Sequence, residues 1–286
     1  MAAAVLFGAS SCVKEDISSS LAGGEVEITF TANLADLGTR AIGEADHIDV
    51  VYLGVYEKNS NTPLSNLFEA DGYRVENGVA TFSVVLLKDK YYDLVFWAQK
   101  KGLDCYSIDW TTRKLTVDYQ TVNAQDETRD AFFKSETFTA KKGVCLNVIL
   151  KRPFAQVNMG VTQTDWQNAA YAGFEITKSS VEIKQAATTL NLVNGLVGSP
   201  VDVTFAVNAI PAADKLIVDF NCDGESEEYK YLSMCYFLAN DSDNGAKQTT
   251  LDGLKFVLSS EDGTKTLTLQ DGLANAPVQR NYRTNI

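Results

Sequence analysis

The stretch VCLNVILKRPFAQVNMGV, residues 144–161, decides the fold that we predict for this chain. Apolar residues occupy even positions from Val144 to Leu150 and odd positions from Ala155 to Val161. Because alternate residues of a β-strand point to opposite faces, this one-residue change of phase directs the two halves toward different cores. Pro153 lies at the change, and proline occurs at strand starts, edges and breaks because it cannot donate to a sheet ladder.

We therefore predict a boundary between two β domains at Lys151, Arg152 and Pro153. In this division residues 1–24 are a signal and flexible tether, residues 25–152 are the first β domain, and residues 153–286 are the second. An alternative stays open, in which residues 144–161 form one long strand with a bulge inside a single large β-sandwich.

Composition and charge limit the class of protein. The 286 residues are 45% apolar and 10% aromatic, which is typical of a globular chain with one large core or two ordinary ones. The net charge of -12 predicts repulsion from nucleic acid and from anionic lipid surfaces, so we expect no nucleic acid partner. The single histidine, His47, excludes sites that need two imidazoles. We predict no catalytic activity, no cofactor and no metal.

Alternating apolar residues predict strands along most of the chain, and thus an all-β fold with few short helical turns. No pattern alternates strands with long helices, which argues against a parallel α/β sheet. In the first half we expect a hairpin turn at residues 88–90, and a short helical turn within residues 123–133 that Phe132 and Phe133 hold against the sheet. A second helical turn is expected near residues 165–171. The expected strands are residues 26–32, 48–56, 79–87 and 91–98, then segments near 181, 190–193, 201–207, 216–220, 229–238, 254–258 and 267–269.

The amino terminus has the pattern of a lipoprotein signal. Residues 1–11, MAAAVLFGASS, are small and apolar but too short to cross a membrane. Cys12 follows and is the predicted site of lipidation. Residues 13–16, VKED, resemble the Lys-acidic-acidic signal that sends lipoproteins of the Bacteroidetes to the cell surface. The alternative is an ordinary frayed terminus with an unmodified cysteine.

The other cysteines, Cys105, Cys145, Cys222 and Cys235, show no C-x-x-C pair and no zinc spacing. Cys145 and Cys235 lie in apolar strand segments, so we expect both to be buried thiols. Disulfides stay possible in an exported protein, but the sequence cannot pair them.

Two further sequence features could suggest chemical sites but have simpler explanations. Residues 219–224, DFNCDG, match the start of a calcium loop, but Lys230 stands where a bidentate glutamate is required, and a polar turn explains the same residues. A hydrolytic triad would need His47, beside Asp46 and Asp49, and the chain has no G-x-S-x-G motif. We favour neither site.

Three segments carry a family resemblance: residues 150–155 (LKRPFA), 231–236 (YLSMCY) and 277–285 (PVQRNYRTN). Together with the lipoprotein signal they resemble the fimbrillin-type lipoproteins of Bacteroidales, the subunits of type V pili and their relatives. The resemblance implies two tandem transthyretin-like β-sandwich domains, a lipid anchor in the outer membrane, exposure at the cell surface and no catalysis. The position in a polymer, as stalk, tip or anchor, stays open.

The resemblance also implies assembly by strand exchange. A trypsin-like surface protease would cut between Arg40 and Ala41, the first strand would leave, and a strand from another pilin subunit would fill the groove. The exchanged strand would present Val26, Ile28, Phe30 and Ala32, with main-chain hydrogen bonds giving affinity and side-chain pockets giving register.

A surface glycan-binding module is the alternative function. Its stacking platform would be Trp110, which lies in an expected loop, whereas Trp97 lies in an apolar strand and is expected in the core. Trp166 is a further aromatic residue that could contribute.

Overall fold

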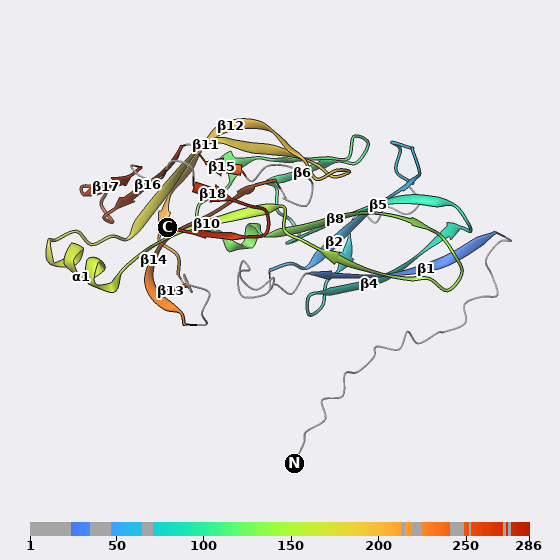
Figure 1. The fold of residues 1–286 in the computed structure, drawn as a ribbon, viewed down its shortest axis with the longest axis horizontal. Coiled ribbons are helices and arrows are strands. Elements are labelled where there is room, and N and C mark those ends of the chain that lie inside the picture. The colour runs from blue at the N-terminus through green and yellow to red at the C-terminus, as the bar shows by residue number, and fades with distance from the viewer. Residues whose placement is uncertain are drawn as a thin grey trace, which may run out of the picture.

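The computed structural model describes residues 24–34, 47–64, 71–212, 215–218, 225–240, 249–251, 253–270, 273 and 276–286. Strands dominate these residues, so the predicted all-β fold is confirmed. The helical elements among them are α1 (Gln163–Tyr171) and the 3-10 turns η2 (Tyr119–Thr121) and η3 (Glu127–Arg129). Figure 1 shows the sheets of the first half and those of the second half arranged along the long axis of the molecule.

Two sheets from the first half of the chain share one core. The first has the strand order β4-β1-β9, with β4 at Val79–Leu87, β1 at Glu25–Leu34 and β9 at Cys145–Leu150. The second has the order β3-β2-β5-β8, with β3 at Tyr73–Arg74, β2 at Val50–Glu57, β5 at Tyr91–Gln99 and β8 at Ala131–Thr139. Buried apolar side chains from β1, β4, β9, β2, β5 and β8 form a single cluster, which makes this half a β-sandwich.

The strands β2 and β5 are buried on both faces. On β5, Phe96 faces the core shared with β1, whereas the next residue, Trp97, belongs to a second core. On β2, Val55 faces the core shared with β1 and the next residue, Tyr56, belongs to the second core. This double burial is why both segments are apolar at nearly every position, as a central strand requires.

Strands of the second half, together with β6 and β7 from the first half, form a ten-stranded sheet with the main order β17-β16-β11-β14-β10-β19. Further strands pair at its sides: β12 and β7 with β11, β13 with β14, and β6 with β7, while β15 and β18 form a separate pair. The bounds are β6 Tyr106–Asp109, β7 Lys114–Val117, β10 Phe154–Val161, β11 Lys178–Asn191, β12 Val197–Ala209, β13 Lys215–Val218, β14 Glu227–Leu238, β15 Thr249–Leu251, β16 Leu254–Ser259, β17 Thr266–Leu269, β18 Ala276–Val278 and β19 Arg283–Asn285.

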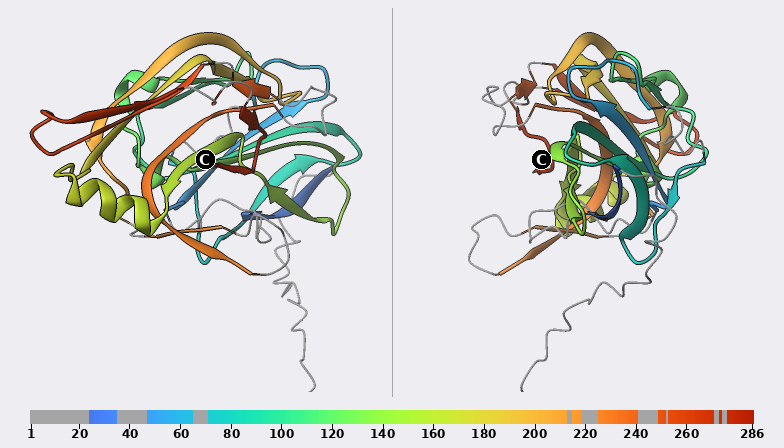
Figure 2. Two further views of the ribbon diagram at one scale, coloured as in Figure 1. Left: turned by 60° about the vertical axis from the view of Figure 1, so that its left-hand side comes forward. Right: turned by 90° about the vertical axis from the view of Figure 1, so that its right-hand side faces the viewer.

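The long pair β11–β12 is strongly curved, as Figure 2 shows. Its register shifts between Ser179 and Val181 and again between Ile183 and Ala186. Such irregularities bend a strand and increase its twist. At the second one Gln185 has φ 57°, and its backbone N–H donates to the Asp202 carboxylate at 3.1 Å. The curvature lets one strand pair with β12, β16 and β7 along its length.

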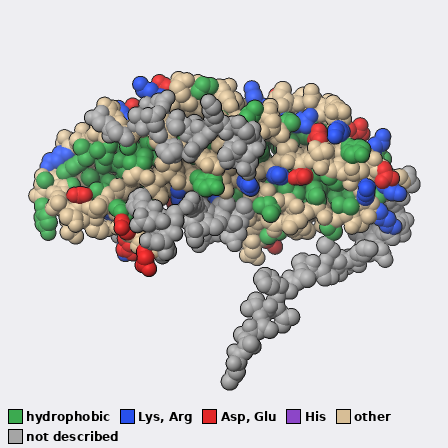
Figure 3. Space-filling view, viewed as in Figure 1, with side chains coloured by type: hydrophobic (Ala, Val, Ile, Leu, Met, Phe, Trp, Pro, Cys, Tyr) green, Lys and Arg blue, Asp and Glu red, His purple; other side chains and the backbone are tan. Residues whose placement is uncertain are grey.

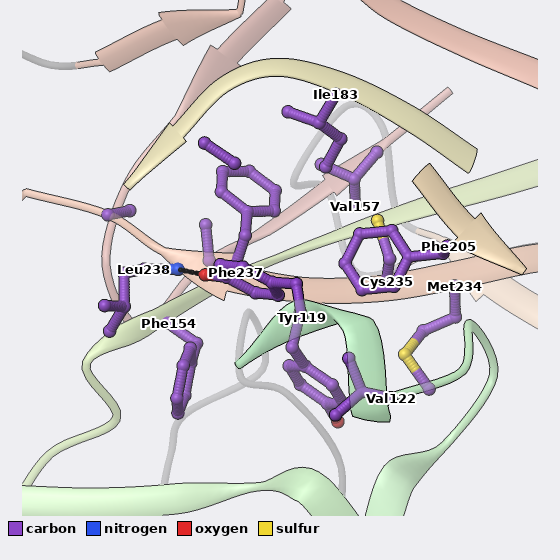
Figure 4. Packing of buried hydrophobic residues seen from close by; sticks show 14 of the residues in the cluster. Tyr119, Val122, Phe154, Val157, Ile183, Phe205, Met234, Cys235, Phe237 and Leu238 are labelled. Atoms are coloured by element: carbon purple, nitrogen blue, oxygen red, sulfur yellow. Dashed lines mark hydrogen bonds between the residues drawn. The ribbon is translucent and has the colours of Figure 1, made fainter. Parts of the chain in front are cut away.

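The second core is larger and includes residues from both halves of the chain. Figure 4 shows Tyr119 of η2 packed among Phe154, Phe205 and Phe237. The Tyr119 hydroxyl donates to the Ala187 carbonyl at 3.0 Å and accepts from the Leu238 N–H at 3.0 Å, so its buried oxygen is satisfied. The hairpin β6–β7 and η2 therefore attach the first half of the chain to the second core.

The change of phase at Pro153 coincides with a change of sheet. Val148 and Leu150 of β9 lie in the first core, while Ala155 and Val157 of β10 lie in the second. Residues 144–161 are therefore two strands in different sheets and not one bulged strand. The division into domains at this point stays a prediction, since β5 contributes to both cores.

Several local predictions need correction. Residues 88–90 do not close a hairpin, because β4 pairs with β1 and β5 pairs with β2 and β8, so this turn connects two sheets. Residue 181 and residues 190–191 belong to the single strand β11, which ends at Asn191. Phe132 and Phe133 lie in β8, directly after the helical turn η3. Cys145 is exposed, because the buried positions of β9 are the even ones, whereas Cys235 is buried as predicted.

Candidate functional site

The strand β1 is hydrogen-bonded along both edges. It pairs antiparallel with β4, from Glu25 opposite Leu87 to Asn33 opposite Val79. On its other side it pairs parallel with β9, from Thr29 opposite Cys145 to Leu34 opposite Leu150. A segment next to the amino terminus thus occupies the centre of its sheet, and its removal would expose two strand edges.

Alternate side chains of β1 fill a row of sites in the first core. The residues of this row are almost completely buried: Val26, Ile28, Phe30, Ala32 and Leu34. Burial of a large apolar side chain is worth about 1.5–3 kcal/mol. Burial of this row therefore stabilises β1 in its sheet.

Phe30 lies at the centre of this row and is 0% exposed. Its ring centroid lies 5.7 Å from that of Phe82, 5.9 Å from that of Phe96 and 5.8 Å from that of Phe138. Tyr73 stacks on Phe82, at 3.7 Å between centroids. The strands β4, β5 and β8 thus build an aromatic pocket that fits an aromatic side chain at this register.

The opposite face of β1 is polar and only partly covered. The hydroxyls of Thr29 and Ser83 share a hydrogen bond of 3.0 Å, and the Asn33 side-chain amide donates to Asn147 on β9. Such solvent-accessible bonds contribute little net free energy. They favour correct register between β1 and its two neighbours.

The structure places some of the predicted site residues and not others. Val26, Ile28, Phe30 and Ala32 all point into the first core from β1. Cys12, Arg40 and Ala41 lie outside the described residues, as do residues 219–224 of the calcium motif. In the sequence, Arg40 and Ala41 fall between the end of β1 at Leu34 and the start of β2 at Val50.

The three segments that carry the family resemblance meet in one sheet. β10 follows residues 151–153 and lies between β14 and β19. Phe154 to Val161 pair antiparallel with β14, and Gln156 to Asn158 pair parallel with β19. Segments more than 120 residues apart in sequence are thus neighbouring strands, so the motifs describe a common packing unit.

Asn158 of β10 connects these three strands through its side chain, which is 1% exposed. Its Nδ2 donates to Asn285 Oδ1 at 2.9 Å on β19, and its Oδ1 accepts from the Tyr231 hydroxyl at 2.7 Å on β14. Burial raises the pKa of Tyr231 above its ordinary value, so this hydroxyl stays protonated and donates.

One protein-family model matches almost the whole chain. It matches residues 19–286 and is described as a family of unknown function, DUF6562. The chain belongs to DUF6562. No curated protein matches this DUF6562 sequence.

Several solved structures are similar to this DUF6562 chain at low identity. A candidate cell adhesion protein from Parabacteroides distasonis has 13% identity and a TM-score of 0.48, with 90% of this chain and 86% of that chain covered. The tip fimbrial protein Mfa3 from Porphyromonas gingivalis, truncated at its C-terminus, has 12% identity and a TM-score of 0.46, with 90% and 91% covered. A candidate polysaccharide-binding protein from Bacteroides thetaiotaomicron has 13% identity and a TM-score of 0.43, with 91% and 89% covered.

Trp110, the predicted stacking platform, lies in the turn between β6 and β7 and is partly buried against the second core. A Cβ atom at Gly54 would lie 2.8 Å from a carbon of its ring, so the indole covers the backbone of β2. The Trp110 carbonyl accepts from the Tyr56 hydroxyl at 2.6 Å. Trp97 is fully buried, as predicted, and Trp166 is partly buried with the Lys230 ammonium 5.1 Å from its ring.

A buried ion pair that the sequence did not predict lies where the two cores meet. Arg152 is 0% exposed, and its Nε donates to both oxygens of Asp130 at 2.8 and 2.6 Å. Burial raises the pKa of Asp130 to about 6, although the Arg152 guanidinium and the more distant His47 lower it. The pair joins the turn before β8 to the segment between β9 and β10.

Two arginines of the resemblance segments cover opposite faces of β8. The Arg152 guanidinium lies 4.4 Å from the ring centroid of Phe132, which faces the first core. The Arg280 guanidinium lies 5.1 Å from the ring centroid of Phe133, which faces the second core. The Nε of Arg280 donates to the Ala239 carbonyl at 3.1 Å. Arginine usually lies at the surface. Arg152 adjoins the apolar residues of two strands, which is a weak sequence signal of burial, whereas the polar neighbours Gln279 and Asn281 give no such signal for Arg280.

Among the described residues, no group of three or more histidine, cysteine or acidic side chains is arranged to hold a metal ion. In the same residues no helix has the length and apolar character needed to cross a membrane.

Proposed function

We propose that this protein is a structural or adhesive subunit at the bacterial cell surface, anchored in the outer membrane through a lipid on Cys12. It assembles with other pilin subunits when a trypsin-like surface protease cuts between Arg40 and Ala41 and β1 leaves its groove. It acts without catalysis. The proposal extends the sequence resemblance to fimbrillin-type lipoproteins.

The observation that supports it is the position of β1 at the centre of its sheet. After a cut at Arg40, β1 would be held to the rest of the protein by non-covalent contacts alone. Its loss would leave the edges of β4 and β9 unpaired and the Phe82, Phe96 and Phe138 pocket open. Such a groove is unfavourable until another strand fills it, which gives a driving force for association.

The test is limited trypsin digestion of the folded chain, with intact mass and size-exclusion chromatography as readouts. Cys12 and Cys222 are changed to serine to limit thiol chemistry. We expect one early cut after Arg40, loss of the peptide that contains β1, and growth of larger assemblies. The variant Arg40→Gln should lose both the cut and the assemblies.

An engineered disulfide between β1 and β9 would distinguish cleavage of the chain after Arg40 from release of β1. Thr29 lies opposite Cys145 in neighbouring parallel strands, a spacing at which a disulfide can form. In the variant Thr29→Cys, oxidation should lock β1 to β9, so the chain is cut but keeps its first strand and stays monomeric until it is reduced. Thr31→Cys is the matched control, because Thr31 lies opposite Asn147. Assembly of the oxidised, locked protein would contradict strand exchange.

Glycan binding at Trp110 is the weaker alternative. Because the indole packs onto β2 at Gly54, one face of the ring is already covered.

A further inference from the structure

Backbone contacts gather five exposed lysines at the end of the molecule where β1 begins. The N–H of Lys88 donates to the Gly24 carbonyl at 2.7 Å, and the N–H of Ala140 donates to the Lys90 carbonyl at 3.0 Å. The N–H of Lys58 donates to the Tyr91 carbonyl at 3.0 Å. The turns that follow β2, β4 and β8 therefore lie together. We call their lysines the basic tip: Lys58, Lys88, Lys90, Lys141 and Lys142.

The basic tip differs in sign from the rest of the protein. Three carboxylates lie in the same turns and strand ends: Glu25, Glu57 and Asp89. Five lysines against three carboxylates leave a local excess of positive charge, although the whole chain has a net charge of -12. Figure 3 shows basic side chains at this end of the molecule. Charges farther away than about 10 Å are largely screened at physiological salt, so the tip interacts through its own charge.

Apolar side chains accompany the lysines. Leu87 at the end of β4 is 46% exposed, and Tyr91 at the start of β5 is 58% exposed. The Lys58 ammonium lies 5.5 Å from the centroid of the Tyr91 ring. Exposed tyrosine and leucine among lysines are typical of surfaces that lie at a membrane interface, where the aromatic ring and the lysine stems contact the headgroup region.

We propose that the basic tip docks onto a lipid surface with anionic headgroups, because its local charge is opposite to the net charge that predicts repulsion of the chain as a whole. Each lysine near such a surface contributes favourably to binding, and one acyl anchor alone holds a protein only marginally. In the cell the docking would add to the proposed anchor at Cys12, which precedes Gly24 by 12 residues, a reach of at most roughly 40 Å. The tip would then hold the start of β1 toward the membrane and the second core away from it.

The test is flotation of the full chain with vesicles, using the variant Cys12→Ser so that no lipid contributes. Vesicles of phosphatidylcholine alone are compared with vesicles that contain phosphatidylglycerol. We expect binding only to the anionic vesicles and loss of binding at high salt. Reversal of four lysines, Lys88→Glu, Lys90→Glu, Lys141→Glu and Lys142→Glu, should weaken partitioning at least about tenfold.

A matched control carries the same change of net charge elsewhere: Lys100→Glu, Lys114→Glu, Lys151→Glu and Lys184→Glu, all exposed positions. It should bind nearly as well as the parent protein. Equal losses in the two variants, or binding to heparin but not to anionic vesicles, would overturn the proposal. Circular dichroism and melting curves check that both variants fold, and neutral Lys→Gln versions replace any that do not. Because no cleavage is involved, this result is independent of strand exchange.

Discussion

Phe30 is the residue whose environment most constrains the candidate site. Its ring touches three others in a pocket built by β4, β5 and β8, while its neighbours Thr29 and Thr31 lie on the partly exposed face. The same pocket would select the side chain of any strand that replaces β1. In the proposed strand exchange, this aromatic position would contribute to register and specificity.

The change Phe30→Ala should lower the free energy of unfolding by about 3–5 kcal/mol, because it removes a fully buried ring and leaves a cavity. Chemical denaturation followed by circular dichroism measures this. Thr31→Ala on the same strand should cost far less. Similar losses for both variants would show that the pocket does not hold β1.

Asp130 gives a prediction about pH. Its pKa in the folded protein is raised to about 6, above the value of about 4 in an unfolded chain. The folded state therefore binds a proton more tightly, and the stability linked to this group is fully present below about pH 4 and lost as pH rises through about 6.

We expect the unfolding free energy of the parent protein, relative to Asp130→Asn, to fall between pH 4.5 and pH 7.5. Titratable groups that do not interact with Asp130 are the same in both proteins, so their contributions cancel in the difference. Urea denaturation at several pH values measures it. If the unfolding free energy of the parent protein relative to Asp130→Asn instead rises with pH, the attraction of Arg152 exceeds the cost of burying the Asp130 carboxylate.

At the scale of elements, β10 holds together the strands that carry the family resemblance. Its hydrogen bonds to β14 and β19 are reinforced by the buried side chain of Asn158. A buried polar group that loses its partner costs about 1–3 kcal/mol. The three motifs are therefore expected to be energetically coupled.

Asn158→Leu should destabilise the protein by about 1–3 kcal/mol, because the Tyr231 hydroxyl loses the oxygen to which it donates. Asn285→Ala removes only the bond to β19 and should cost less. Hydrogen exchange should show increased opening of β19 in both variants but of β14 only in Asn158→Leu. Unchanged exchange in β14 would contradict a connecting role.

At the scale of the whole molecule, β5 couples the two cores. Phe96 and Trp97 are adjacent, fully buried residues that face different cores. A strand cannot unfold on one face alone. The two halves of the chain should therefore unfold together, even though the chain changes sheet at Pro153.

Phe96→Ala and Trp97→Ala should each destabilise the protein by about 3–5 kcal/mol and shift the same single transition. Calorimetry and circular dichroism would record it. Two transitions, with each variant shifting a different one, would show independent domains on either side of Pro153.

The sequence by itself determined the all-β class, most strand positions and the change of buried face at Pro153, because strand periodicity is local and each apolar residue reports its own side of the sheet. It also determined that alternate residues of β1 are buried. Only the tertiary structure decided that residues 88–90 connect two sheets, that β1 lies between β4 and β9, and that Arg152 and Asp130 form a buried pair. These features depend on contacts between residues far apart in the chain, and short-range patterns contain no information on which distant strand supplies the partner.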